Sequence, residues 1–166
     1  MPELLIMRHA KSDWGGGLAS DRERPLARRG EKAAKRMGRF LAKMGRAPEI
    51  VLSSPAVRAR TTAELAAQAG RWGTSVEIID SFYGGGWADV VDGVLAHAAS
   101  ADRVLVVGHE PTWSDLASVL TGGSLVGMPT AALACVAVIG SSWSKLGPAC
   151  AELQWLVTPR MLKSLL

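Results

Sequence analysis

Short apolar segments alternate with helix-like segments along most of this 166-residue chain. Short apolar runs bounded by turn residues predict buried strands, here at residues 4–7, 49–52, 76–79, 103–107, 132–139 and 150–157. Between them, the sequence predicts helices at residues 31–43, 54–69, 87–98 and 112–120. This alternation favours a three-layer α/β/α fold with a mostly parallel sheet between two layers of helices. The last two strands are close enough in sequence to form an antiparallel edge.

The size and composition of the chain favour a single folded domain over residues 1–166. Nearly half of the residues, 48%, are apolar, which is enough for a substantial core. We expect a cytoplasmic protein without a membrane partner, for two reasons. The first apolar run is quickly interrupted by Arg8, and the longest apolar stretch, residues 131–139, is too short to cross a bilayer. Cys135 and Cys150 lack metal-site spacing and are expected to be core thiols, although a disulfide between neighbouring strands stays open.

Positive charge is concentrated in one part of the chain. The net charge is +4, and ten Lys and Arg residues lie between Arg22 and Arg46. A basic protein of this kind suits an anionic substrate or partner. Apolar residues at helical spacing run through the same segment, so the charges are best explained as the solvated face of a helix. No aromatic residues alternate with the charges, and we therefore expect no nucleic-acid partner.

Residues suited to phosphate chemistry follow three of the predicted strands. Arg8 and His9 come directly after the first strand, and His109 follows the strand at residues 103–107. Arg58 lies in the first turn of the helix after the second strand, with Ser54 as its predicted N-cap. The carboxyl ends of parallel strands meet at one edge of a sheet, where ligands bind. Two arginines, two imidazoles and a helix N-terminus at that edge indicate a phosphate pocket.

Three motifs in this pattern resemble the histidine phosphatase superfamily, the phosphoglycerate mutase-like enzymes. They are the sequences LIMRHA at residues 5–10, SSPAVRARTTA at residues 53–63 and VVGHE at residues 106–110. The resemblance spans roughly the first 120 residues. Residues 8–12 and 21–30 are similar to the small SixA-type phosphohistidine phosphatases in particular. The resemblance implies a phosphoglycerate mutase-like fold and a phosphatase that uses neither a metal nor another cofactor.

The resemblance also implies a role for each residue of the pocket. His9 would be the nucleophile that is transiently phosphorylated, and Arg8, Arg58 and His109 would hold the phosphoryl oxygens. Phosphoryl transfer spreads negative charge over those oxygens, so positioned donors stabilise it. His9 must be neutral at its attacking nitrogen, and we expect a backbone contact to hold its other nitrogen. His109 would donate most effectively if the neighbouring charge keeps it protonated.

Other residues near the motifs depart from the family pattern or add candidates for the pocket. The glycine that usually follows Arg-His in the superfamily is Ala10 here, and an asparagine of mutase-like members corresponds to Gly15. Ser12 is a candidate for a further phosphate contact. Trp14 and Trp113 follow the two histidine motifs, and we expect them to wall the pocket.

Two carboxylates are candidates for a proton donor. Asp80 stands at the spacing where the mutase branch has a glutamate, and Glu110 directly follows His109, as a carboxylate does in the acid phosphatase branch. Either can instead be a surface acid or a helix-cap partner. An alkoxide leaving group needs a proton donor more than a phosphoramidate does. Because neither carboxylate is a strong candidate for this donor, the sequence favours phosphohistidine on a protein as the substrate. The alternatives are a phosphatase of small phosphomonoesters and a non-catalytic phosphate-binding module, against which the presence of a nucleophile counts.

Overall fold

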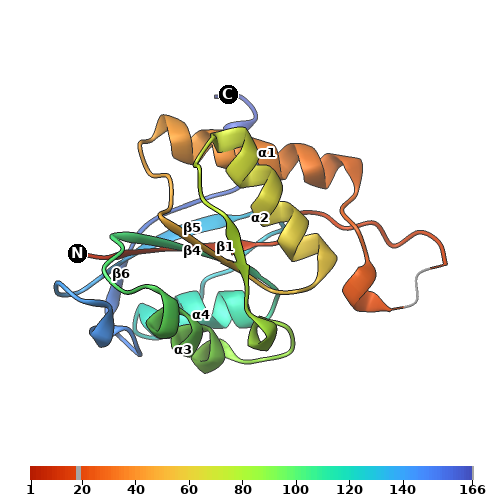
Figure 1. Ribbon diagram of the computed structural model, residues 1–166. Coiled ribbons are helices and arrows are strands. Elements are labelled where there is room, and N and C mark those ends of the chain that lie inside the picture. Colours follow the sequence, from red (N-terminus) through yellow and green to blue (C-terminus); the bar gives the residue numbers. More distant parts are fainter. Residues whose placement is uncertain (18–19, 166) are drawn as a thin grey trace.

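The computed structural model describes residues 1–17 and 20–165, and the strands of this part form one mixed sheet (Figure 1). The sheet has six strands in the order β3-β2-β4-β1-β5-β6. Their bounds are β1 Glu3–Arg8, β2 Ile50–Ser53, β3 Val76–Ile78, β4 Arg103–Gly108, β5 Leu133–Val138 and β6 Ala151–Val157. The first four are parallel, whereas β5 runs antiparallel to both β1 and β6. The predicted mostly parallel sheet with an antiparallel edge is therefore confirmed.

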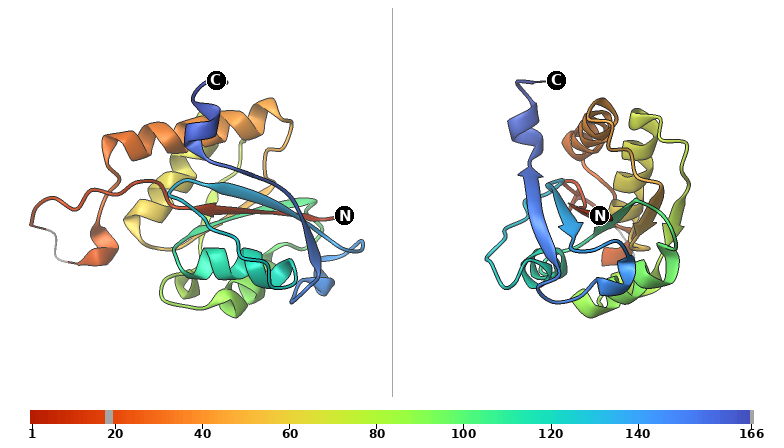
Figure 2. Two further views of the ribbon diagram at one scale, coloured as in Figure 1. Left: turned by 180° about the vertical axis from the view of Figure 1, so that it is seen from behind. Right: turned by 90° about the vertical axis from the view of Figure 1, so that its left-hand side faces the viewer.

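Helices cover both faces of this sheet, which confirms the three-layer α/β/α architecture (Figure 2). One layer contains α1 (Arg28–Lys43) and α2 (Val57–Gly70), and the other contains α3 (Trp87–His97) and α4 (Thr112–Leu120). A short helix that the sequence did not predict, α5 (Pro159–Leu162), follows β6 and lies beside α1. Three short 3-10 turns complete the described elements: η1 (Asp21–Glu23), η2 (Asp80–Phe82) and η3 (Trp143–Lys145). None of the helices in residues 1–17 and 20–165 is long and apolar enough to cross a membrane.

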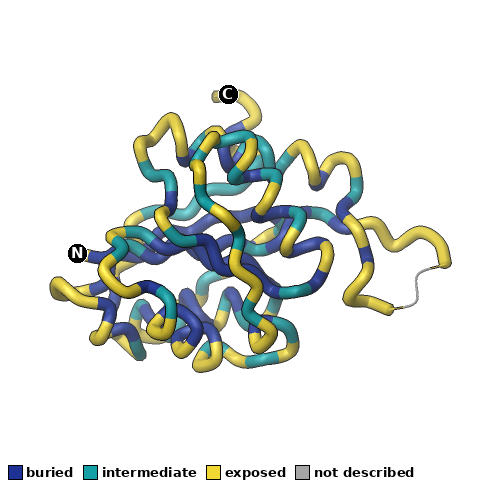
Figure 3. Tube along the Cα trace, in the orientation of Figure 1, coloured by how far each residue is buried: buried dark blue, intermediate teal, exposed yellow. Residues whose placement is uncertain are grey.

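The core lies on both sides of the central strands, which are buried along their length (Figure 3). Successive side chains of a strand point to opposite faces. In β1, Leu5 and Met7 therefore pack with α1 and α2, and Leu4 and Ile6 pack with α3 and α4. All four side chains are fully buried. Burial on both faces explains why β1 and β4 are nearly continuous apolar runs.

The close packing of α1 against α2 depends on a glycine. A Cβ atom added at Gly38 would lie 2.0 Å from the backbone oxygen of Ala66, so the two helix backbones touch at this point. Any larger residue would push the helices apart. Because α2 carries Arg58, this contact helps to set the position of that arginine.

Some sequence predictions about local structure were wrong. Helix α2 begins at Val57 with Ala56 as its N-cap, rather than at Ser54-Pro55. The reason is that the backbone N–H of Ser54 donates to Val107 O and so continues the pairing of β2 with β4. Helix α1 begins at Arg28, three residues before the predicted start at Glu31. Leu18 and Ala19, between β1 and η1, lie outside the described residues.

Trp113 and the two cysteines belong to the framework of the fold. Trp113 is completely buried and donates through Nε1 to Val106 O, so the expectation that it walls the pocket was wrong. Its ring occupies the space beside Gly108, where a Cβ would lie 2.2 Å away. Both cysteines are free thiols: Cys135 is buried, and Cys150 is half-buried. Burial raises the pKa of Cys135 to about 12, so this thiol stays protonated.

Candidate active site

Backbone hydrogen bonds bring the ends of three neighbouring strands together. The N–H of His9 donates to Gly108 O over 2.9 Å, and the N–H of Ser54 donates to Val107 O over 3.0 Å. The side chains that follow β1, β2 and β4 therefore meet at one edge of the sheet. The imidazole centroids of His9 and His109 are 5.1 Å apart. The convergence expected from the sequence is present in the fold.

The imidazole of His9 is held by its Nδ1 atom. Nδ1 lies 2.7 Å from Ala10 O, and because a carbonyl oxygen only accepts, the proton of the neutral ring must be on Nδ1. This is the backbone contact that the sequence analysis expected. The Nε2 atom is then left with its lone pair. Thr62 of α2 supports this arrangement: its hydroxyl accepts from Ala10 N–H and donates to Arg58 O.

His9 is neutral at ordinary pH. Burial of the ring, of which 7% is exposed, lowers its pKa from 6.5 to about 4. The positive charges of Arg58 and Arg8 add to this effect, and the hydrogen bond to Ala10 opposes it. A neutral imidazole with an unprotonated Nε2 can act as a nucleophile.

His109 is also neutral, so it is not in the protonated state in which it would donate most effectively. Burial, together with the neighbouring His9 and Arg58, lowers its pKa to about 3, and the negative charge of Asp21 only partly opposes this shift. Its Nε2 atom lies 2.7 Å from the Ser54 hydroxyl. Ser54 already accepts from Ala56 N–H, so its own proton can be donated to Nε2. The ring proton then lies on Nδ1, and neutral His109 can still donate one hydrogen bond.

The two arginines and His109, within the described residues, each have a buried N–H group without a hydrogen-bond partner. Arg8 donates through Nη1 to Met128 O over 3.0 Å, and Arg58 donates through both Nη atoms to Asp21. Arg8 Nε, Arg58 Nε and His109 Nδ1 are buried and have no hydrogen-bond partner within residues 1–17 and 20–165. An unpaired buried donor costs about 1–3 kcal/mol. Three such donors from three different elements fit a site that binds an oxyanion.

Asp21 in η1 accepts hydrogen bonds from two arginines, a role that the sequence did not indicate. Its Oδ2 accepts from Arg58 Nη2 over 2.9 Å and from the Tyr83 hydroxyl over 3.0 Å, and its Oδ1 accepts from Arg24 over 2.9 Å. Burial opposes ionisation of this carboxyl, but the hydrogen bonds from Arg24 and Tyr83 and the charge of Arg58 lower its pKa to about 2. A carboxylate therefore stands beside the anion site at neutral pH. Asp21 lies in the segment that resembles the SixA branch, but spacing alone could not reveal its contact with Arg58.

Arg24 adds a third guanidinium next to the two imidazoles. It is 8% exposed, and its Cζ atom lies 3.6 Å from the ring centroid of Trp14. The hydroxyl of Ser12 accepts a hydrogen bond from Arg24 Nη1. Ser12 therefore positions Arg24, and its predicted direct contact with phosphate stays a prediction.

The two candidate proton donors have contacts that match their structural alternatives. The Asp80 side chain is 90% exposed and lies 3.7 Å from Arg22, whereas both oxygens of Glu110 accept from Ser114 in the first turn of α4. Within the described residues, neither carboxylate hydrogen-bonds with an imidazole. Tyr83 contacts His109 instead, with ring centroids 5.6 Å apart. The same part of the chain contains no group of three or more His, Cys, Asp or Glu side chains arranged to hold a metal ion.

The free energy of unfolding is expected to fall as the pH is lowered from 6.5 to about 4. In this range, the imidazoles of His9 and His109 bind protons in the unfolded chain but not in the folded one. Because the unfolded state binds more protons, stability rises with pH, by about 1.4 kcal/mol per pH unit for each residue. Urea denaturation at a series of pH values measures this slope. A His9→Gln/His109→Gln variant with the same slope as the wild type would contradict the assignment.

Comparison with known proteins gives matches that agree with this geometry. The family model described as "Histidine phosphatase superfamily (branch 1)" matches residues 4–83. A Mycobacterium tuberculosis protein described as uncharacterized is 35% identical over 165 residues, which cover 93% of this chain and 100% of the relative.

Two solved structures are similar over nearly the whole chain. A protein assigned as phosphohistidine phosphatase SixA from Nakamurella multipartitia is 30% identical, with a TM-score of 0.81 and coverage of 95% of this chain and 96% of that one. The protein histidine phosphatase SixA complexed with tungstate is 27% identical, with a TM-score of 0.84 and coverage of 97% and 99%.

Proposed function

This chain belongs to the histidine phosphatase superfamily and is a phosphatase, and we propose that it removes the phosphoryl group from phosphohistidine on a protein through a covalent phospho-His9 intermediate. The observation that carries the proposal is the state of His9. Its ring is neutral, its proton is held on Nδ1 by Ala10 O, and three neighbouring residues, Arg8, Arg58 and His109, each have a buried N–H group without a partner in the described part of the chain. A site that only binds phosphate needs the donors but not the nucleophile.

The proposed first step is attack of His9 Nε2 on phosphorus. The bond from phosphorus to the substrate nitrogen breaks, and the electron pair stays on the leaving imidazole, which takes up a proton from water. Negative charge spreads over the three equatorial oxygens during this transfer. Arg8 Nε, Arg58 Nε and His109 Nδ1 are the groups that would donate to those oxygens. Tungstate, which accompanies one SixA structure, is a tetrahedral oxyanion like phosphate, and this supports the proposal.

In the proposed second step, water attacks the phosphorus of phospho-His9. The bond to Nε2 breaks, inorganic phosphate leaves and the neutral imidazole is restored. The hydrogen bond between Nδ1 and Ala10 O keeps the ring in the same orientation through both steps. The buried hydroxyl of Thr62 holds the backbone of Ala10 and so supports this orientation from α2.

The environment of the carboxylates supports phosphohistidine as the substrate. Asp80 is exposed, and both oxygens of Glu110 are engaged by Ser114, so neither is poised to protonate an alkoxide. The leaving nitrogen of phosphohistidine is basic and the P–N bond is labile, so this substrate needs less acid catalysis. Both SixA structures, which cover at least 95% of the chain, are described as phosphatases of phosphohistidine or of protein histidine.

A comparison of two substrates tests the proposal. We expect kcat/KM for a phosphohistidine-carrying protein to exceed that for an alkyl phosphate such as glycerol 3-phosphate by about tenfold or more, because an alkoxide leaving group needs general acid help worth about a hundredfold or more. Glu110→Gln keeps an oxygen for Ser114, and Asp80→Asn keeps the shape of an exposed side chain. Each is expected to change phosphohistidine turnover by less than about threefold, well below the loss of a general acid.

Two results would overturn the assignment of the substrate. One is a higher kcat/KM for the alkyl phosphate than for the phosphoprotein. The other is a hundredfold loss in Glu110→Gln or Asp80→Asn, which would make that carboxylate the proton donor and favour phosphomonoesters.

A further inference from the structure

A basic groove of about 900 Å³ lies between α1 and α5. It is lined by residues of both helices and by the segments that precede β5 and α5: Arg29, Lys32, Ala33, Arg36, Pro129, Thr130, Thr158, Pro159, Arg160 and Lys163. Half of these residues are Lys or Arg, and none is acidic or aromatic. Figure 2 shows α5 standing beside α1, so the groove is formed by elements far apart in the sequence.

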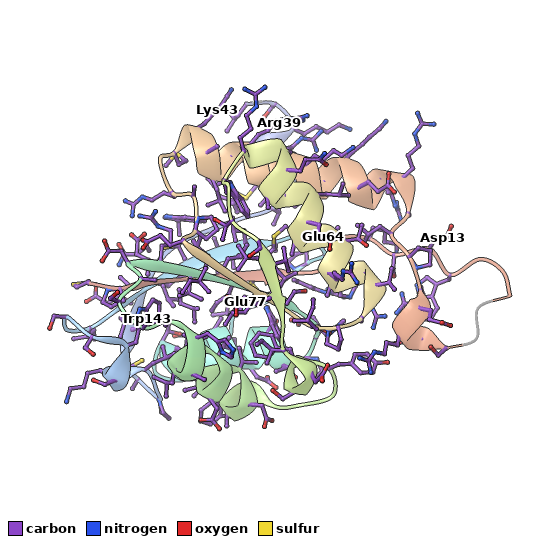
Figure 4. All side chains as sticks on the ribbon, viewed as in Figure 1. Asp13, Arg39, Lys43, Glu64, Glu77 and Trp143 are labelled. Carbon is purple, nitrogen blue, oxygen red and sulfur yellow. The ribbon has the colours of Figure 1, made fainter. Side chains whose placement is uncertain are left out.

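The groove continues into the charged face of α1. At 100° per residue, all seven Lys and Arg residues of this helix fall within an arc of about 120°, opposite the buried Met37 and Leu41. The helix contains one acidic residue, Glu31. Figure 4 shows Arg39 and Lys43 projecting from α1 away from the sheet.

The cations of this surface lack acidic partners in the described part of the chain. No Lys or Arg of α1 or α5 forms an ion pair within residues 1–17 and 20–165. Several basic residues elsewhere are paired, as Arg46 and Arg103 are with Glu3, and Arg60 is with Glu64. Unpaired like charges on one face repel each other and attract an acidic partner.

The groove adjoins the candidate active site. Pro129 and Thr130 lie between Met128, whose carbonyl accepts from Arg8, and Ala131, whose N–H donates to His9 O over 3.1 Å. The strand register places α5 at the same edge. Val157 of β6 pairs with Leu133 of β5, and Leu133 pairs with Met7, two residues before His9.

We propose that this groove is the docking surface for an acidic segment of the phosphohistidine-carrying protein. This inference rests on the proposed function and names a property of its substrate. With a phosphohistidine bound at His9, the polypeptide on one side of it would pass over Pro129 and Thr130 into the groove. There its acidic side chains would lie near the five Lys and Arg residues of the lining. The lining offers no aromatic platform on which the bases of a nucleic acid could stack, and this favours an acidic protein. Exposed charges of this kind mainly change the association rate and KM of the substrate, and this effect becomes smaller as salt screens the charges.

Two synthetic peptides test the docking surface directly. Each has a central histidine, flanked in one by glutamates and in the other by glutamines, and each is phosphorylated on histidine with phosphoramidate. We expect the wild type to prefer the glutamate peptide by about tenfold in KM at low salt, and to lose most of this preference near 0.5 M salt, roughly where the screening length falls below 5 Å.

A charge-reversal variant and a matched control test whether the preference for the glutamate peptide depends on the groove. Lys32→Glu/Arg160→Glu is expected to abolish it, with p-nitrophenyl phosphate turnover changed by less than about twofold. Arg71→Glu/Lys145→Glu changes the net charge by the same amount at two exposed positions away from the groove, and it should keep the preference. An equal loss in both variants would overturn the proposal.

Binding measurements keep the proposal separate from the phosphatase assignment. Fluorescence anisotropy of the labelled, unphosphorylated glutamate peptide reports docking even if neither phosphopeptide is hydrolysed. In that case the proposed function would be refuted, whereas the docking surface would stand. Binding of a labelled single-stranded DNA that is lost in Lys32→Glu/Arg160→Glu, without loss of the glutamate preference, would assign the groove to nucleic acid instead. Peptide binding that is the same in the wild type and the groove variant would refute the docking surface.

Discussion

Replacing His9 with Ala is expected to abolish turnover and the formation of a phosphoenzyme. The variant lacks the Nε2 atom that the proposed mechanism requires, while Arg8, Arg58 and His109 remain to bind phosphate. Loss of the nucleophile in enzymes with covalent intermediates costs up to about 10⁶ in kcat, and we expect a loss on the order of 10⁴ or more here. The measurement is trapping of a labelled, acid-labile phosphoenzyme after rapid quenching, with the label mapped by peptide analysis.

Controls separate this effect from a loss of folding. His9→Asn keeps an amide that can donate to Ala10 O, so it serves where His9→Ala proves unstable. His97→Ala changes the third histidine of the chain, which lies on α3 with Nδ1 at 2.8 Å from Gly93 O, and it should retain activity and the phosphoenzyme. A label that persists in both His9 variants, or that maps to His109, would refute His9 as the nucleophile.

Replacing Arg58 with Lys is expected to lower kcat/KM by about 10²–10³, the usual effect of removing one donor from an oxyanion site. Arg58 donates through both Nη atoms to Asp21, and its buried Nε, which has no partner within the described residues, is the group proposed to bind a phosphoryl oxygen. The single ammonium of lysine retains the charge but cannot reach Asp21 and a phosphoryl oxygen in the same planar geometry. The defect should therefore appear although the net charge is unchanged. Steady-state kinetics and the affinity for tungstate, measured by calorimetry, report it.

Arg60→Lys is the matched control for this prediction. Arg60 lies two residues further along α2, is exposed and pairs with Glu64 over 2.8 Å. The same substitution there should change kcat/KM by less than about twofold, because exposed ion pairs are worth about 1 kcal/mol or less and this pair is outside the site. Equal kinetics for Arg58→Lys and the wild type would mean that Arg58 supplies only its charge and that the planar set of guanidinium N–H donors has no role.

Much of the fold could be predicted because the sequence patterns that specify its helices and strands lie within single segments of the chain. The bounds of α4 and the run of β4 follow from apolar periodicity within one segment, and the antiparallel edge follows from the short connection between β5 and β6. The start of α2 could not be predicted in this way. Ser54 has the properties of an N-cap, but its backbone is engaged by β4 and its hydroxyl by His109, both distant in sequence.

For the site, the sequence by itself determined which residues meet: parallel strands place their carboxyl ends at one edge, so Arg8, His9, Arg58 and His109 had to converge. Only the tertiary structure decided how they meet. The contacts of Arg58 with Asp21 and of His109 with Ser54 join residues 37 and 55 positions apart, and no spacing rule specifies them. The same holds for the neutral state of His109, because burial and neighbouring charges, which exist only in the packed chain, set its pKa.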